Sequence, residues 1–132
     1  MSFEKRLEIK SKMCYNKVAL FFVRILGGIM KYLICVLIGY LIGSINPSYI
    51  ISKLCGGDIR EKGSGNAGAS NALIVYGKLI GVFCALFDIG KAFFAVWLMR
   101  SAFSDLPLVF ALTAVACILG HVFPFYMRFR GG

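Results

Sequence analysis

The residues of this chain that could do chemistry are concentrated in one long polar stretch, Asp58 to Asn71, inside a strongly apolar sequence. Four charged residues lie near its start, and a loop rich in Gly, Ser and Asn follows. Glycines let a ligand approach the backbone closely, and hydroxyl and amide groups supply hydrogen bonds. A helix that starts near Ala72 would add the free N–H groups and positive dipole end of its N-terminus. Together these features predict an anion-binding site.

The loop from Gly63 to Asn71 has other interpretations. The same residue types are common in flexible, solvated connectors between helices. Gly63 to Gly68 also fits the G-x-G-x-x-G pattern of dinucleotide-binding folds, with Asp88 at a suitable distance. That fold requires a strand before the glycines, whereas charged residues precede Gly63 and Asp88 lies deep in an apolar run. No G-K-[ST] closes the loop, so a Walker loop is excluded and the anion site and the connector stay open.

Composition sets the class of protein. Of 132 residues, 59% are hydrophobic and only 16% are charged, and the mean hydropathy is +0.80. A soluble domain of this size is much less apolar, so the sequence predicts an all-α integral membrane protein. The net charge of +9 does not predict a nucleic-acid partner, because the basic residues flank apolar segments. In that position they set orientation and meet anionic lipid headgroups.

The five cysteines are scattered and form no C-x-x-C pair. They are typical of small apolar residues facing lipid or neighbouring helices, and they support neither a disulfide framework nor a zinc site. We expect no metal and no cofactor.

Three apolar runs are long enough to span a membrane. They cover Tyr32–Ile51, Leu79–Met99 and Leu106–Met127, with a short helical turn at Ala72–Tyr76 after the polar loop. In the first run, Gly39 and Gly43 have the G-x-x-x-G spacing that lets another helix approach closely. Its second half contains Asn46 and Pro47, so we expect a kinked end that lines the site, or a kink whose polar groups are satisfied locally.

Charged and polar residues also lie within the later spans. Asp88 and Lys91 stand at i and i+3, so each can neutralise the other on one helix face. Because charges in hydrocarbon are costly, the pair is either a functional site or a structural ion pair. His121 follows near the end of the third span. Two spans separate it from the polar loop, so both should lie on the same side of the membrane.

Residues 1–29 form a basic extension. The apolar run Val18–Ile29 is too short to cross a bilayer by itself, so it could lie on the membrane surface. Alternatively, Met30 is the natural start. Counted from Met30, most basic residues fall on the side of the polar loop, which places this loop in the cytoplasm. Residues 1–29 add basic residues to the opposite side, which conflicts with this orientation.

With these residues assembled, the chain resembles the bacterial acyl-phosphate:glycerol-3-phosphate acyltransferase family, the PlsY type. The resemblance covers roughly residues 30–132. It rests on the segments Gly43 to Lys53, Gly57 to Asn71, Gly77-Lys78, Asp88 with Lys91, and Gly120 to Pro124 through Arg130-Gly-Gly132.

The resemblance implies an all-helical enzyme of the plasma membrane. Such an enzyme transfers a fatty acyl group from acyl phosphate to glycerol 3-phosphate, giving lysophosphatidate and phosphate for phospholipid synthesis. It implies Ser64, Asn71 and His121 as catalytic residues. Phosphate binding would fall to Lys62, Gly63, Ser64, Gly65, Asn66, Gly68, Gly131 and Gly132. Its partners would be both substrates, membrane lipid and a second copy of the chain. Acyl phosphate is already activated, so no acyl-enzyme nucleophile is needed and Ser64 is not assigned as one.

Two departures from the family pattern affect this expectation. Ile74 stands where the family usually carries an arginine, which removes one expected phosphate contact. The sequence also stops at Gly132, before the rest of a fold of about seven membrane helices in the family. We therefore expect the N-terminal part of an acyltransferase domain in a truncated product. The alternatives are a non-catalytic membrane fragment and a small transporter subunit, for which Asp88 and Lys91 would be pathway residues.

Overall fold

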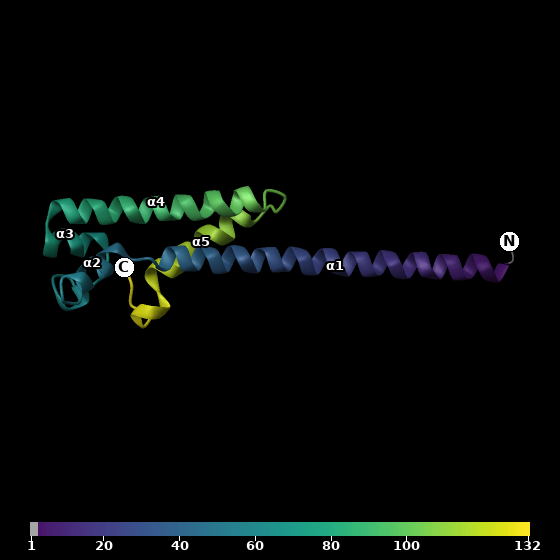
Figure 1. The fold of residues 1–132 in the computed structure, drawn as a ribbon, viewed down its shortest axis with the longest axis horizontal. Coiled ribbons are helices and arrows are strands. Elements are labelled where there is room, and N and C mark those ends of the chain that lie inside the picture. Colours follow the sequence, from purple (N-terminus) through teal and green to yellow (C-terminus); the bar gives the residue numbers. More distant parts are fainter. Residues whose placement is uncertain (1–2) are drawn as a thin grey trace.

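The computed structural model describes residues 3–132, and the described part of the chain contains helices and no strand (Figure 1). Its elements are α1 (Phe3–Ser44), α2 (Pro47–Leu54), α3 (Ala69–Tyr76), α4 (Lys78–Ala102) and α5 (Val109–Val122), with two short 3-10 turns, η1 (Ile59–Glu61) and η2 (Phe125–Met127). The all-α prediction is confirmed. So is the helix after the polar loop, which starts at Ala69.

Within residues 3–132, three helical segments are long and apolar enough to cross a membrane, as predicted. They are Tyr15–Ser44, Lys78–Ala102 and Val109–Met127. The first is longer than the sequence suggested, because residues 18–29 lie in the same unbroken helix as the rest of α1. At 1.5 Å per residue, α1 is about 63 Å long and α4 only about 38 Å.

The predicted end of the first span was wrong. We expected a kinked helix running to Ile51, but α1 ends at Ser44 and a separate helix, α2, begins at Pro47. Proline lacks an N–H and restricts the preceding residue to extended backbone, and Asn46 has φ −115° and ψ 103°. The Asn46 side chain then caps α2 by accepting a hydrogen bond from the Tyr49 N–H at 2.9 Å. The break leaves carbonyl groups at the end of α1 without helical partners.

The G-x-x-x-G pair of α1 packs against α5, which confirms the predicted close approach of another helix. A Cβ on Gly39 would lie 2.7 Å from the carbonyl oxygen of Thr113, and one on Gly43 would collide with the carbonyl of Cys117. From the other side, a Cβ on Gly120 would collide with the carbonyl of Tyr40. Backbone contact of this kind is how membrane helices pack tightly without a hydrophobic driving force.

The polar elements gather at one end of the molecule. Figure 1 shows α2, α3 and the C-terminus together there, with the turn between α4 and α5 at the opposite end of α4. His121 and the polar loop are thus on the same side, as expected. Near the α4–α5 turn, Lys31 of α1 pairs with Asp105 at 2.9 Å. From that point α1 extends alone toward the N-terminus, and the described side chains of residues 15–27 are exposed.

Candidate active site

The polar loop is organised around the buried amide of Asn71. The Nδ2 of Asn71 lies within hydrogen-bond distance of three carbonyls, which share its two N–H donors: Ile59 at 3.0 Å, Lys62 at 2.9 Å and Asn66 at 2.7 Å. Its Oδ1 accepts from the Ser64 N–H at 2.8 Å. Asn71 is 1% exposed. One side chain at the start of α3 therefore fixes the course of the whole loop, and buried polar groups satisfied in this way are costly to remove.

Asp58 and Arg60 form a second organising pair beside η1. The Asp58 carboxylate caps the turn by accepting from the Arg60 N–H at 3.0 Å. It also accepts from the guanidinium, at 3.0 Å from Nε to Oδ1 and 2.7 Å from Nη2 to Oδ2. The hydrogen bonds from Arg60 hold the pKa of Asp58 well below its ordinary value, and Asp58 raises the pKa of Arg60. Both groups therefore stay charged at neutral pH.

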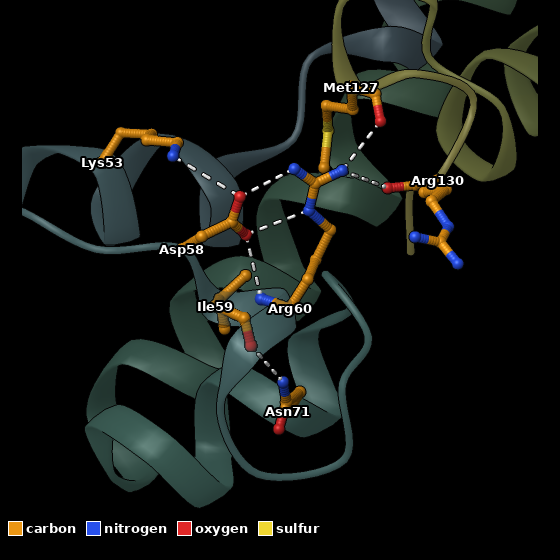
Figure 2. A network of polar contacts seen from close by, with 7 residues as sticks. All are labelled: Lys53, Asp58, Ile59, Arg60, Asn71, Met127 and Arg130. Carbon is orange, nitrogen blue, oxygen red and sulfur yellow. Dashed lines mark hydrogen bonds and ion pairs between the residues drawn. The ribbon is translucent and has the colours of Figure 1, made fainter.

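Arg60 also joins the loop to the end of the chain. Its Nη1 donates to the carbonyl of Met127 at 2.7 Å and, more weakly, to that of Arg130 at 3.4 Å, as Figure 2 shows. The guanidinium lies over the Tyr49 ring, 5.0 Å from its centroid. Lys53 approaches the same carboxylate, at 3.4 Å from Nζ to Asp58 Oδ2. The arginine thus connects α2, η1 and the segment after α5.

The glycine-rich loop, Gly63 to Gly68, meets the C-terminal pair Gly131 and Gly132 directly, and we call these segments the two glycine motifs. The Ala67 N–H donates to the Gly131 carbonyl at 3.3 Å. A Cβ on Gly132 would lie 3.2 Å from the Gly68 Cα, and one on Gly131 would collide with the carbonyl of His121. Backbone without side chains is therefore needed on this side of the contact, which we call the glycine contact (Gly68 with Gly131 and Gly132).

A polar cavity of about 920 Å³ lies beside the glycine contact. Its lining includes four basic and two acidic side chains: Lys53, Arg60, Arg128, Arg130, Asp58 and Glu61. Because Asp58 is neutralised by Arg60, the remaining charge on the wall is positive. A wall of this charge favours an anion.

The turn that carries two of these arginines has strained backbone. Arg128 and Phe129 both adopt left-handed conformations, with φ 56° and φ 58°. Each costs about 1–2 kcal/mol for a residue with a side chain. Strain of this kind persists where the surroundings impose it, and it clusters at functional sites. Here the Phe129 N–H donates to the Pro124 carbonyl at 3.1 Å, which closes the turn.

An apolar groove of about 570 Å³ adjoins the polar cavity. Tyr49, Lys53 and Tyr126 line both. The rest of the groove is mostly aliphatic and aromatic: Leu41, Ser44, Ile45, Ile50, Leu54 and Phe125. A ligand with a charged head and an apolar tail would fit a polar cavity that continues into such a groove.

A largely buried charge cluster adjoins the glycine contact, because Gly132 lies against the ring of His121. Lys91 Nζ lies 2.7 Å from Asp88 Oδ1, 2.5 Å from the Ile45 carbonyl and 3.2 Å from His121 Nδ1. The Ile45 carbonyl is one of those freed by the break after α1, so an ammonium at that helix end also matches the dipole. The predicted pair of Asp88 and Lys91 is present. His121 contacts Lys91 as well, so the three residues form one cluster.

Comparison with known proteins identifies the family. Residues 33–132 match the family model described as glycerol-3-phosphate acyltransferase. The chain belongs to the glycerol-3-phosphate acyltransferase family. This confirms the resemblance found in the sequence.

Among curated glycerol-3-phosphate acyltransferases, that of Thermotoga petrophila is 48% identical over 97 residues, which are 73% of this chain and 49% of the relative. That of Bordetella pertussis is 42% identical over 99 residues, covering 74% and 46%. A crystal structure of PlsY (YgiH), an integral membrane glycerol 3-phosphate acyltransferase, in its glycerol 3-phosphate form has a TM-score of 0.69 at 38% identity. It covers 76% of this chain and 50% of that one. The chain spans about half the length of the relatives it matches.

The structure brings only some of the family-implied residues to the cavity wall. Gly65, Asn66, Gly131 and Gly132 line it, whereas Lys62, Gly63, Ser64 and Gly68 do not. Ser64 is exposed, and its N–H is occupied by Asn71. His121, Asp88 and Lys91 do not line the cavity either. The described atoms thus place Asn71 inside the loop as the residue that shapes it.

Sequence reasoning missed the basic and aromatic residues of the cavity. Arg60 was placed in the polar stretch and Arg130 in a family-like segment, but neither was assigned a role in the site; Arg128 was counted only for membrane orientation, and Tyr49 and Tyr126 were not singled out. One local signal existed, because an aspartate two residues before an arginine can cap a turn and pair with it. Nothing local to Arg60 predicts its bonds to carbonyls near the C-terminus.

Proposed function

We propose that this chain carries the N-terminal part of an active site that transfers a fatty acyl group from acyl phosphate to glycerol 3-phosphate. The products are lysophosphatidate and phosphate. One observation carries the proposal: two glycine motifs meet beside a cationic cavity that continues into an apolar groove. Both substrates bear phosphate and one bears a long apolar tail, so the two compartments match the two parts of the donor.

The proposed reaction needs no covalent intermediate with the protein. A hydroxyl of glycerol 3-phosphate attacks the acyl carbonyl, a new C–O ester bond forms, and the bond to phosphate breaks. The hydroxyl proton leaves with the phosphate. The protein has to position the two substrates and offset the negative charge of their phosphates. Lys53, Arg128 and Arg130 supply positive charge at the cavity wall, and the glycines allow close approach.

In this proposal Ser64 offers an exposed hydroxyl to a substrate phosphate. Asn71 acts by shaping the loop, and His121 is a polar group at the glycine contact. The membrane is proposed to be the plasma membrane, with the polar loop in the cytoplasm. The basic residues Lys53, Arg60, Lys62, Lys78, Arg128 and Arg130 support this orientation.

The test is acyl transfer in membranes that contain this chain, supplied with acyl phosphate and labelled glycerol 3-phosphate. Acyl-CoA serves as the control donor. The chain is measured alone and together with the remaining half of a full-length relative, expressed separately. Lysophosphatidate formed from acyl phosphate in either arm, and reduced at least tenfold by Ser64→Ala, supports the proposal. Absence of product in both arms, with the chain present and inserted, would identify a non-catalytic fragment.

A further inference from the structure

The buried ammonium of Lys91 has three close polar neighbours. It forms an ion pair with Asp88 Oδ1 at 2.7 Å, donates a hydrogen bond to the Ile45 carbonyl, and lies 3.2 Å from Nδ1 of His121. Lys91 is 7% exposed. An ammonium carries three donors and cannot accept. The contact with Nδ1 is therefore a hydrogen bond only when that nitrogen carries no proton.

The other arrangement of protons fits the geometry less well. If Nδ1 carried the proton, its acceptor would be Asp88 Oδ1, but these atoms lie 3.6 Å apart, beyond hydrogen-bond range. The same oxygen already forms an ion pair with Lys91 at 2.7 Å. A proton on Nδ1 would also face the ammonium directly. The positions of the three groups thus favour neutral His121 with its proton on Nε2.

The Nε2 edge of the imidazole faces the glycine contact. A Cβ on Gly132 would lie 2.9 Å from both Cε1 and Nε2 of His121, and 3.2 Å from the Cα of Gly68. A side chain at residue 132 would require the imidazole ring to shift. Nε2 therefore lies beside the place where the two glycine motifs meet.

We propose that Lys91 is a positioning residue that holds His121 in the Nε2–H tautomer, so that the imidazole presents a hydrogen-bond donor at the glycine contact. The ligand for this donor is a phosphate-bearing substrate, a step that rests on the proposed function. The tautomer itself does not depend on that function. Lys91 thereby acts on the site through a neighbouring ring, with no contact to substrate of its own.

The test uses a property of the sequence, which contains a single histidine. Protein labelled with ¹⁵N in histidine gives imidazole signals from His121 alone, and their chemical shifts distinguish a protonated from an unprotonated ring nitrogen. Spectra are recorded in nanodiscs at pH 8, above the ordinary histidine pKa of about 6.5. The native chain should show a protonated Nε2 and an unprotonated Nδ1.

Two variants and one control separate positioning from a general structural effect. In Lys91→Met the carboxylate of Asp88 loses its ammonium, and His121 becomes its nearest donor, so the proton should appear on Nδ1. In the double variant Asp88→Asn with Lys91→Met, that acceptor is also neutral, and Nδ1 should lose most of this protonation. Lys78→Met removes an exposed cation from the same helix and should leave the native tautomer unchanged.

A protonated Nδ1 in the native chain would overturn the proposal without recourse to any variant. An unchanged tautomer in folded Lys91→Met would do the same. Glycerol 3-phosphate added to the native chain should shift the Nε2–H signal. If the tautomer is as described and this shift is absent, the assigned ligand fails together with the proposed function, while the role of Lys91 stands.

Discussion

Two acid–base pairs of similar spacing perform different tasks in this molecule. Asp58 and Arg60 lie at the end where the polar elements gather, and Asp88 and Lys91 lie inside the helical bundle. In both pairs the cation also bonds backbone carbonyls of another element. The guanidinium holds both carboxylate oxygens and still reaches the segment after α5. The ammonium instead hydrogen-bonds the Ile45 carbonyl, pairs with Asp88 by charge and lies 3.2 Å from Nδ1 of His121.

The difference shows how the choice of cation follows the task. A planar guanidinium with a fork of donors can join several backbone segments at once, which suits the assembly of a loop. A compact ammonium can sit between a carboxylate, a helix end and an imidazole, which suits the orientation of a ring. A third pair, Lys31 with Asp105, is exposed. It serves as a reference, because it neither assembles a loop nor orients a ring.

The largest effect is expected from breaking the buried pair. Lys91→Met leaves Asp88 without its cation, and the loss of one partner of a buried pair costs about 3–5 kcal/mol. The double variant with Asp88→Asn should recover most of this loss, because no uncompensated charge remains. Unfolding in mixed micelles measures both free energies. Equal destabilisation in the single and double variants would show that the pair does not act as a unit.

The second effect concerns the fork of Arg60. Arg60→Lys keeps the charge but cannot bond both carboxylate oxygens and the Met127 carbonyl together. We expect a loss of about 1.5–3 kcal/mol, the range for hydrogen bonds to charged groups. Arg100→Lys, at an exposed position on α4, is the matched control and should be close to neutral. Loss of the same size in both variants would contradict the assembly role of Arg60.

Acid provides a smaller and reversible way to weaken the same pair. The pKa of Asp58 is lowered by folding, so its contribution to stability is complete above the ordinary value of 3.8 and declines as the pH falls below it. Between pH 5 and pH 3 the stability difference between the native chain and Asp58→Asn should shrink by about 1 kcal/mol. A difference that already shrinks between pH 7 and pH 5 would mean that the carboxylate is not held by Arg60.

The smallest effect is expected at the exposed pair. Hydrogen bonding from Lys31 lowers the pKa of Asp105, but both groups are solvated and the attraction is screened by salt. Asp105→Asn should not measurably change the unfolding midpoint at physiological salt. A shift of the unfolding midpoint as large as that of Arg60→Lys would show that the difference in exposure does not determine how much each pair stabilises the fold.

The sequence predicts the helical class and the spans well, because apolar runs of sufficient length have one stable solution in lipid. It also locates the polar loop, the intramembrane pair and the glycine approach of α1. The exact end of the first span was misjudged, since Asn46 and Pro47 fit both a kinked helix and a break followed by a new cap.

What the sequence could not show depends on contacts between distant residues. Arg60 bonds carbonyls of Met127 and Arg130, and a backbone carbonyl has no residue-specific signal in a sequence. The place of His121 beside Lys91 depends on the packing of α4 against α5. For Asn71, an amide in a glycine-rich loop suits either ligand contact or loop support, and only the folded geometry separates them.

The reach of Arg60 also has a consequence for the order in which the protein is made. Its partners Met127 and Arg130 lie at and just after the end of the last of two further spans, so they are synthesised long after the arginine itself. Before these two residues are made, the loop has already emerged from the ribosome but lacks the carbonyl partners of Arg60. A nascent chain paused before residue 127 should therefore expose this loop to protease, and release of the pause should protect it.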